Sequence, residues 1–364
     1  MTEPLPVSSI STLVSTARQQ PLRAALWHAT AAIALAWTGL TAAHAQTTPI
    51  KFVLDWKLQG VHAWYYLAQE RGYFAQEKIA LQIDTGDGSA NTVTKVMAGS
   101  YQAGFGDINA IIQNAATRPA GTVPVMVYMI YNRAPFAIMT KASGPIKTLK
   151  DLEGRNIGSP AGGAAMKMFP ALADKNGIDA GKVRWTNMAP NLQEQMLRRD
   201  QVDASAVFSV TSYLNLVAQQ VDPDKDIRWF HYADHGIELY GNGVLVSPQL
   251  IKDKPQVVAG LVRAIHKGLR DAAQDPDAAI DALARQEPLI NKVIEKRRLQ
   301  YALRQVIVTP ETQRAGVGDV QDARLQRAIA QVAEAFELPR QPVAGEVFDR
   351  RFLPPLADRQ LTLK

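Results

Sequence analysis

The stretch that decides the fold of this chain lies at residues 54–74 and reads LDWKLQGVHAWYYLAQERGYF. A short apolar strand from Ile50 to Leu54 leads into it, and a polar and aromatic loop follows. An amphipathic helix comes next and ends at Gly72, before a second strand from Ile79 to Ile83. A loop between a parallel strand and a helix lies at the carboxyl edge of the sheet, where open α/β sheets bind ligands. The candidate ligand contacts in this loop are Trp56, Gln59 and His62. His62 would donate a hydrogen bond to the ligand or be a satisfied, partly buried histidine, and Trp56 would be a stacking platform or part of the core.

Apolar strand patterns alternate with helical patterns along most of the chain, which is typical of a parallel or mixed α/β sheet. The strongest strand pattern, at 123–130, is apolar throughout and predicts burial on both faces. Other strands are predicted at 136–140, 183–187, 204–208, 228–232 and 243–246. Helices are predicted at 92–98, 109–116 and 145–152, and in the helical tail at 257–274, 276–285, 292–305 and 322–336.

Two glycine-containing loops each lead into a predicted helix. In the loop at 86–92, the amide N–H groups and the helix dipole suit an anionic or carbonyl oxygen, although N-capping is the alternative role. The candidates there are Ser89 and Asn91. In the loop at 159–165 the glycines let the backbone approach a ligand closely. The candidates there are Ser159, Gly162 and Gly163. Two facing helix N-termini would clamp an oxygen-rich group.

Further candidates stand at predicted strand ends and at a turn of the chain. Asp107 could bind an amino group of a ligand or cap the next helix. Phe208 and Ser209 end a strand, so their aromatic and hydroxyl groups would face a ligand at the sheet edge. Tyr240 precedes Gly241, a small residue suited to a hinge.

His231 and His235 have a spacing that would suit a metal if they stood on a helix. The local pattern is a strand that enters a turn, so we expect the two imidazoles to diverge. No Ser-His-Asp order, paired-carboxylate signature or nucleophile elbow stands out. We therefore expect no catalytic residue, no metal site and no cofactor.

Residues 1–45 have the layout of a secretory signal peptide. Arg18 and Arg23 precede an apolar run from Ala24 to Ala42, and Ala43-His44-Ala45 forms a small-x-small cleavage site. A membrane anchor is the alternative, and the weakly apolar, Ala-rich composition argues against it. Cleavage after Ala45 predicts a protein that is secreted through the inner membrane into the periplasm.

The composition excludes several classes of function. The chain has no Cys, which excludes disulfides, thiolate metal sites and thiol catalysis. Its 40 Lys and Arg and 34 Asp and Glu are interspersed and give a net charge of +6. Nothing forms a basic stripe for nucleic acid, so the expected ligand is a small molecule.

The opening motif resembles the start of the periplasmic binding proteins of ABC importers for sulfonates, taurine, nitrate and thiamine pyrimidine precursors. The Leu-Asp-Trp run with a His six residues after Trp56 is similar to the thiamine-pyrimidine branch. That branch usually has x-Pro-Asn where this chain has Lys57-Leu58-Gln59, so the ligand stays open. A pyrimidine, a sulfonate, nitrate and an aromatic acid are the alternatives.

The resemblance implies an α/β, two-lobe periplasmic binding protein fold of type 2, with each lobe a mixed sheet flanked by helices. Lobe 1 would comprise residues 46–138 and 242–364, and lobe 2 residues 139–241, with the ligand between them. It also implies an inner-membrane ABC permease as partner and a monomeric protein. The alternative is an enzyme of the thiamine pyrimidine synthase type on the same fold. That enzyme uses a cysteine-rich iron-binding motif, and this chain has no Cys.

Overall fold

The first of two sheets contains the strand that leads into the opening motif. Its strand order is β2-β1-β3-β10-β4. β1 pairs in parallel with β2 and β3, whereas β10 runs antiparallel to both β3 and β4. β3 and β10 are buried along their whole length, as a central position in the sheet requires. The strands are β1 (Thr48–Val53), β2 (Ile79–Asp84), β3 (Ala103–Asp107), β4 (Val125–Met129) and β10 (Asn242–Val246).

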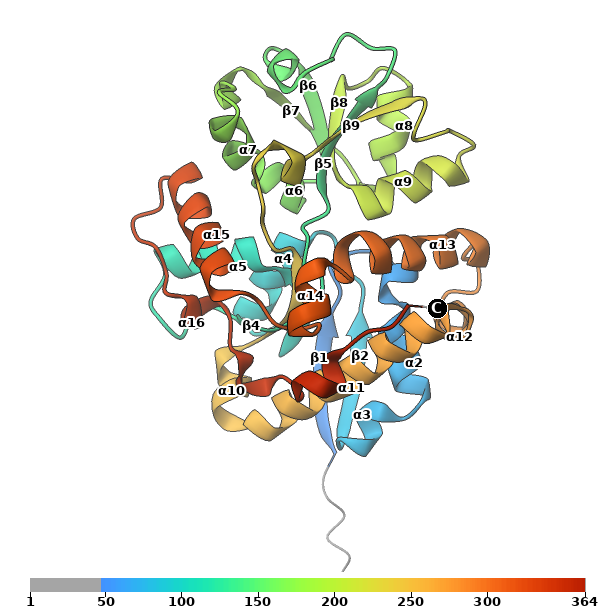
Figure 1. Ribbon diagram of the computed structural model, residues 1–364, viewed down its shortest axis with the longest axis vertical. Coiled ribbons are helices and arrows are strands. Elements are labelled where there is room, and N and C mark those ends of the chain that lie inside the picture. Colours follow the sequence, from blue (N-terminus) through green and yellow to red (C-terminus); the bar gives the residue numbers. More distant parts are fainter. Residues whose placement is uncertain (1–46, 364) are drawn as a thin grey trace, which may run out of the picture. The chain divides into compact units, whose positions relative to one another are not determined.

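The second sheet is formed by the middle of the chain and has the order β7-β6-β8-β5-β9. β6 is parallel to β7 and β8, and β5 is antiparallel to β8 and β9. Its strands are β5 (Phe136–Lys141), β6 (Asn156–Ser159), β7 (Arg184–Asn187), β8 (Ala204–Phe208) and β9 (Ile227–His231). Both sheets are mixed and flanked by helices (Figure 1), which confirms the predicted fold class.

The chain passes between the sheets twice, through residues 130–135 and 232–241. β5 begins at Phe136, shortly before the predicted lobe boundary at 138/139, and the exact lobe boundaries stay a prediction. The computed structural model describes residues 47–363, and the expected signal peptide lies outside them. Within that range, no helix is long and apolar enough to cross a membrane.

The first sheet is covered by helices from both ends of the described chain. α11 lies along α2, so the tail of the chain packs against its start (Figure 1). α10, α11, α12 and α14 each begin with Pro, whose fixed φ suits the first turn of a helix. The helices on this side are α2 (Ala63–Glu70), α3 (Tyr73–Gln76), α4 (Ser89–Met97), α5 (Ile108–Thr117), α10 (Pro248–Asp253), α11 (Pro255–Gln274), α12 (Pro276–Gln286), α13 (Lys292–Ala302), α14 (Pro310–Ala315), α15 (Asp322–Ala335) and α16 (Ala344–Val347).

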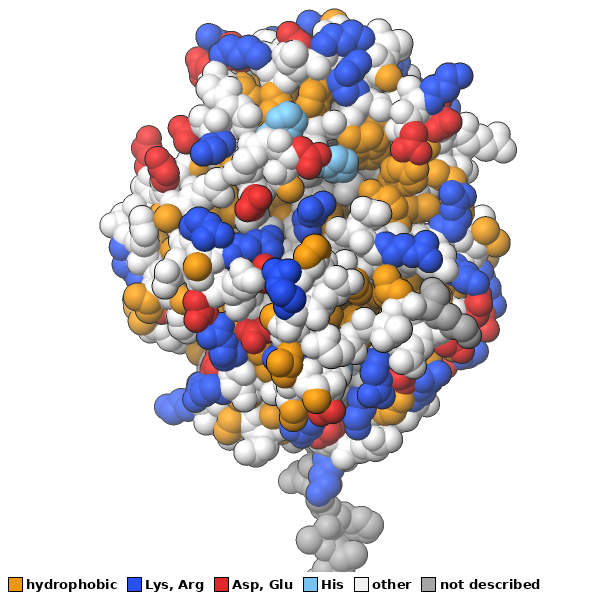
Figure 2. Space-filling view, in the orientation of Figure 1, with side chains coloured by type: hydrophobic (Ala, Val, Ile, Leu, Met, Phe, Trp, Pro, Cys, Tyr) orange, Lys and Arg blue, Asp and Glu red, His pale blue; other side chains and the backbone are white. Residues whose placement is uncertain are grey.

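The second sheet is flanked by α6 (Ala164–Lys167), α7 (Phe169–Lys175), α8 (Gln193–Arg198) and α9 (Ser209–Ala218). On the face shown in Figure 2, Lys and Arg side chains are interspersed with Asp and Glu and form no continuous basic stripe.

Three predicted helices differ in the structure. The helix expected at 145–152 is only a 3-10 turn, Leu149–Leu152, because Thr148 and Asp151 cap it locally and Pro145 cannot donate a backbone hydrogen bond. α2 is buried from Ala63 to Ala68 and so has no polar face over that stretch, because α11 and α12 pack on it and Tyr65 contacts Phe52 and Phe105 of the sheet. The helix expected at 292–305 changes to a π-helical turn, Leu303–Ile307, after α13.

Candidate functional site

A cavity lined by residues from both sides lies between the two sheets, a place in the fold where small-molecule sites commonly occur. The first sheet's side contributes Asp55, Trp56, Gln59, Val61, His62, Ser89 and Tyr131. The second sheet's side contributes Pro160, Gly163, Ala164, Ala165, Gln193, Ala206, Val207, Phe208 and Thr211. Six of the residues singled out from the sequence are therefore brought together here: Trp56, Gln59, His62, Ser89, Gly163 and Phe208.

A buried hydrogen-bonded chain runs through the wall of the cavity next to Trp56. The Gln59 N–H donates to Nδ1 of His62 at 3.2 Å, so this imidazole carries its proton on Nε2. Nε2 in turn donates to Oδ1 of Asp55 at 2.8 Å, and Nδ2 of Asn242 donates to Oδ2 of Asp55 at 2.8 Å. Both ring nitrogens of His62 are thus engaged within the protein, and its expected hydrogen bond to a ligand has no free nitrogen. His62 instead orients Asp55.

Asp55 is the polar group that the sequence reasoning missed. It lines the cavity, is only 6% exposed, and lies two residues after β1, directly before Trp56. A carboxylate has about four acceptor positions, of which His62 and Asn242 use two. The residues that line the cavity, all in the described part of the chain, include no Lys or Arg. A donor-bearing ligand therefore suits this wall better than an anion does.

Two polar atoms in the cavity wall are buried and have no hydrogen-bond partner: Nε1 of Trp56 and Oγ of Ser89. Buried polar groups in native proteins are nearly always satisfied, so each such atom calls for an explanation. Ser89 is the first residue of α4 and does not cap it. The two atoms offer a ligand one N–H donor and one hydroxyl beside a half-buried indole ring.

The two glycine loops touch each other directly. A Cβ atom on Gly88 would lie 2.5 Å from the carbonyl oxygen of Gly162, and a Cβ on Gly162 would lie 2.5 Å from Nδ2 of Asn91. Asn91 and Gly162 therefore meet each other and are not among the cavity-lining residues, whereas Ser89 and Gly163 are. The loops that precede α4 and α6 therefore contact each other, as the expected pair of helix N-termini would. The helix on the second side, α6, has only four residues.

We expect Gly162→Val to weaken ligand binding about tenfold, because a branched side chain would displace Asn91 and lower the fraction of molecules with the loops in contact. Isothermal titration calorimetry measures the affinity, and circular dichroism shows that the fold persists. Gly345→Val is the matched control, since a Cβ there meets nothing within 4 Å. Equal affinities for both variants would mean that the loop contact has no part in binding.

Besides Asn91 and Gly162, four other predicted residues lie outside the cavity lining: Ser159, Ser209, Asp107 and Tyr240. Ser159 donates its hydroxyl to the carbonyl of Pro160 at 3.2 Å. Ser209 begins α9, and its N–H donates to the carbonyl of Pro135 at 2.8 Å. Asp107 caps α5, because its Oδ1 accepts from both the N–H (3.2 Å) and the side chain (2.8 Å) of Asn109.

Burial raises the pKa of Asp107 to about 7, although Asn109 donates two hydrogen bonds to its carboxylate. The pKa of an unfolded Asp is about 3.9, so the folded protein binds this proton more tightly. The stability that this group contributes is therefore complete below about pH 4 and is lost as pH rises through about 7.

We expect Asp107→Asn to flatten the pH dependence of stability. Between about pH 4 and 7.5 the natural protein should lose up to about 4 kcal/mol more unfolding free energy than the variant. Urea unfolding at a series of pH values measures this difference, with the exposed Asp200→Asn as control. Parallel curves for the natural protein and Asp107→Asn would contradict the expectation.

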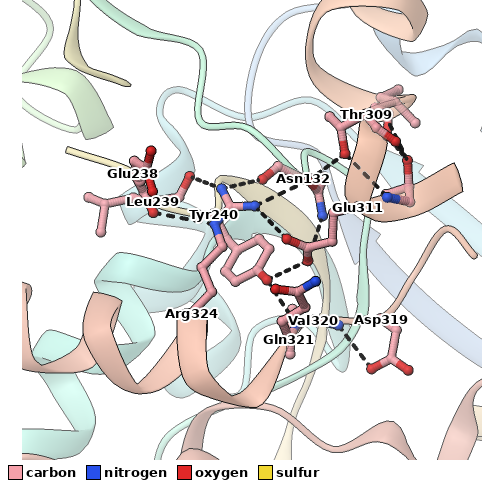
Figure 3. Close-up of polar contacts among 12 residues, drawn as sticks. Asn132, Glu238, Leu239, Tyr240, Thr309, Glu311, Asp319, Val320, Gln321 and Arg324 are labelled. Atoms are coloured by element: carbon pink, nitrogen blue, oxygen red, sulfur yellow. Dashed lines mark hydrogen bonds and ion pairs between the residues drawn. The ribbon is translucent and has the colours of Figure 1, made fainter. Parts of the chain in front are cut away.

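Tyr240 belongs to a separate polar network at the two chain crossings (Figure 3). Its Oη donates to Oε1 of Glu311 at 2.5 Å and accepts from the N–H of Gln321 at 2.9 Å. The guanidinium of Arg324 lies 4.0 Å from the centre of the Tyr240 ring and donates to Glu311. Arg324 also donates to the carbonyls of Asn132 (2.8 Å) and Leu239 (3.2 Å), one on each crossing. Arg324 thus ties both crossings to α15, and Tyr240 ties its own crossing to α14 and to the start of α15.

The rings of His231 and His235 pack against different aromatic partners. His231 stacks on Trp229 with ring centres 5.9 Å apart, and His235 lies 6.0 Å from Phe230. Within residues 47–363, no three His, Asp or Glu side chains gather as a metal site.

A family model described as NMT1/THI5 like matches residues 59–279. The formylaminopyrimidine-binding protein of Halalkalibacterium halodurans is 24% identical over 310 residues, which cover 82% of this chain and 88% of that protein. The riboflavin-binding protein of Chloroflexus aurantiacus is 26% identical over 221 residues, 60% of each chain. A 4-amino-5-hydroxymethyl-2-methylpyrimidine phosphate synthase of Legionella pneumophila is 22% identical over 240 residues, 66% of this chain and 74% of the synthase.

Solved structures share the fold. The alkanesulfonate-binding protein of Xanthomonas axonopodis pv. citri, bound to MOPS, has a TM-score of 0.63 at 15% identity, covering 84% of this chain and 99% of that chain. The periplasmic aliphatic sulphonate-binding protein of Escherichia coli has a TM-score of 0.59 at 14% identity, and the match covers 81% of this chain and 95% of that chain. These likenesses confirm the periplasmic binding protein fold, and the family match confirms the resemblance found in the opening motif.

Proposed function

Because the chain belongs to the NMT1/THI5-like family, we propose that it is the solute-binding component of an ABC importer. It would bind a small polar ligand in the cavity between its two sheets and deliver it to an inner-membrane permease. In this proposal the mature protein is a periplasmic monomer that begins after Ala45. Residues 46–138 with 242–364, and residues 139–241, are its two lobes. Ligand would select the arrangement in which the lobes are in contact.

The single observation that carries the ligand class is the Asp55 carboxylate in a wall that contains no Lys or Arg among the described residues. A sulfonate, nitrate or carboxylate would be placed beside a buried acceptor with no cation to balance it. A planar ring with an amino group can donate to Asp55, lie against Trp56 and accept a hydrogen bond from Nε1 of Trp56 or Oγ of Ser89. We therefore propose an amino-substituted heteroaromatic ligand of the pyrimidine type.

The relatives named as pyrimidine phosphate synthases make an enzyme the second candidate. The absence of Cys from the sequence argues against the cysteine-rich iron motif expected of that class. Mass spectrometry distinguishes the two functions, because a binding protein releases its ligand unchanged after prolonged incubation.

A thermal-shift screen of the mature protein tests the proposed function. The panel contains formylaminopyrimidine, 4-amino-5-hydroxymethyl-2-methylpyrimidine, riboflavin, taurine, MOPS and nitrate. A ligand at 100 times its dissociation constant adds about 2.7 kcal/mol of stability. We expect shifts from the aminopyrimidines and none from taurine, MOPS or nitrate. A shift from the anions alone would overturn the ligand class, and no shift from any compound would count against the proposed function.

A further inference from the structure

Helix α13, in the tail of the chain, contacts both sides of the cavity. It packs against α9, which follows β8 of the second sheet, and against the 3-10 turn Gly60–His62 in the loop at 54–62 between β1 and α2, hereafter the ligand loop. Figure 1 shows α13 lying directly beside α9. Arg298 on this helix is 1% exposed, which is unusual for an Arg unless its charge is paired. None of the binding contacts described above uses it.

Arg298 is fully occupied by groups from both sides. Its Nη1 donates to the carbonyls of Val210 (3.1 Å) and Thr211 (2.5 Å), and its Nη2 donates to Oδ1 of Asn215 at 2.9 Å. All three acceptors are on α9. Its Nε donates to Oε2 of Glu295, one turn earlier on α13, at 2.9 Å.

Glu295 connects this ion pair to the ligand loop. Its Oε2 accepts the N–H of Gly60 at 2.6 Å, and a Cβ atom on Gly60 would lie 2.0 Å from the Glu295 carbonyl oxygen. Gly60 stands between Gln59 and His62, which line the cavity. A direct hydrogen bond also joins α9 to the ligand loop, since Oγ1 of Thr211 donates to Oε1 of Gln59 at 3.2 Å. The loop is therefore held to α13, and α13 is held to α9.

We infer that Glu295 and Arg298 are positioning residues: they fix the position of the ligand loop and hold the two sides of the cavity together. The effect on ligand binding rests on the proposed function, whereas the contact between the two sides is present without a ligand. If the sides separate, Arg298 loses three acceptors on α9 and its guanidinium must be rehydrated. Ligand binding and the contact through Arg298 therefore favour the same arrangement, and each strengthens the other.

The ion pair between Arg263 and Glu77 gives a matched control. Arg263 donates from Nε (2.9 Å) and Nη2 (2.5 Å) to the Glu77 carboxylate, as Arg298 does to Glu295. Both residues belong to the first sheet's side, on α11 and after α3, and neither lines the cavity. Arg263→Gln therefore removes an Arg–Glu pair without touching the contact between the sides.

The experiment measures the distance between the two sides by single-molecule fluorescence energy transfer. The absence of native Cys allows dyes to be placed only at Gln256→Cys and Arg184→Cys, both exposed and on opposite sides. The test variant is the double change Glu295→Gln with Arg298→Met, which leaves no unpaired buried charge. Asn215→Leu, which removes one acceptor of Arg298 and one donor to Glu194 and keeps the ion pair, is the second variant. Stopped-flow fluorescence with formylaminopyrimidine gives the rates of binding and release.

We expect the double variant to lower the high-transfer fraction in ligand-free protein and to speed ligand release by about 5- to 100-fold, with little change in association rate. Asn215→Leu should shift both in the same direction by less, and Arg263→Gln should shift neither. If the double variant folds and its energy transfer is unchanged, the inference is overturned. If the double variant does not fold, unchanged energy transfer in Asn215→Leu overturns it. If formylaminopyrimidine and the other screened compounds do not bind, the proposed function fails, but transfer in the free protein still decides the role of Arg298.

Discussion

Asp55→Asn is expected to lower the affinity for an aminopyrimidine by about 10- to 100-fold. A hydrogen bond to a charged group contributes about 1.5–3 kcal/mol, and the amide offers one acceptor oxygen where the carboxylate offered two. The change keeps the shape of the side chain. The fold should survive, because Oδ1 of Asn242 has no partner and a flip of that amide turns it toward the new Nδ2. The affinity is measured by isothermal titration calorimetry.

Asp107→Asn is the matched control for this change. Asp107 is another buried carboxylate at a strand end of the first sheet, opposite Asn242 in the register, but it does not line the cavity. Its substitution should leave the affinity within about twofold. If Asp107→Asn loses as much affinity as Asp55→Asn, the loss comes from a disturbed sheet and not from a lost contact with the ligand. Asp55→Asn removes a negative charge from the cavity wall, so tighter binding of the sulfonates MOPS or taurine by this variant would fit the same electrostatic argument.

The sequence predicted the sheets and the strand, loop and helix around Trp56 well because both depend on local patterns. The strand, loop and helix around Trp56 are neighbours in the chain, and the apolar runs at 123–130 and 243–246, which contain β4 and most of β10, are recognisable without knowledge of their partners. The same holds for Ser89 and Gly163, each of which stands where a loop enters a helix. Burial of β4 and β10 then follows from their apolar composition.

Residues whose role depends on distant partners could not be predicted in this way. Asp55 was next to the predicted contacts, but its importance comes from Asn242, 187 positions away. Thr211 lines the cavity because α9 is brought against Gln59, which no local pattern records. Tyr240 was placed in the site for its position at a crossing, yet Glu311 and Arg324 from the tail engage it elsewhere. The helical tail supplies the partners in two such long-range networks, Glu311 and Arg324 at the crossings and Glu295 and Arg298 beside α9.

Trp56→Ala is expected to lower the affinity for an aminopyrimidine by about 30-fold or more, since truncation of a central Trp in a binding site commonly costs 2 kcal/mol or more. The change removes the flat wall against which a ring would lie and the unpartnered Nε1 donor together. Trp56→Phe separates the two contributions, because it keeps an aromatic face and loses only the N–H. An affinity for Trp56→Phe between those of Trp56→Ala and the natural protein is expected, from calorimetric titration with one aminopyrimidine.

His62→Ala should cost less than Trp56→Ala, because both nitrogens of His62 bind protein groups and its effect reaches the ligand through Asp55. We expect about a tenfold loss, of the order of one hydrogen bond to a charged group. A double variant, His62→Ala with Asp55→Asn, should then bind no more weakly than Asp55→Asn alone, since the two residues act through one carboxylate. For a small anionic ligand the order would reverse, because the indole wall would matter little and a freed imidazole would act as the donor. A larger loss in His62→Ala than in Trp56→Ala would therefore contradict both the ring-shaped ligand and the role assigned to His62.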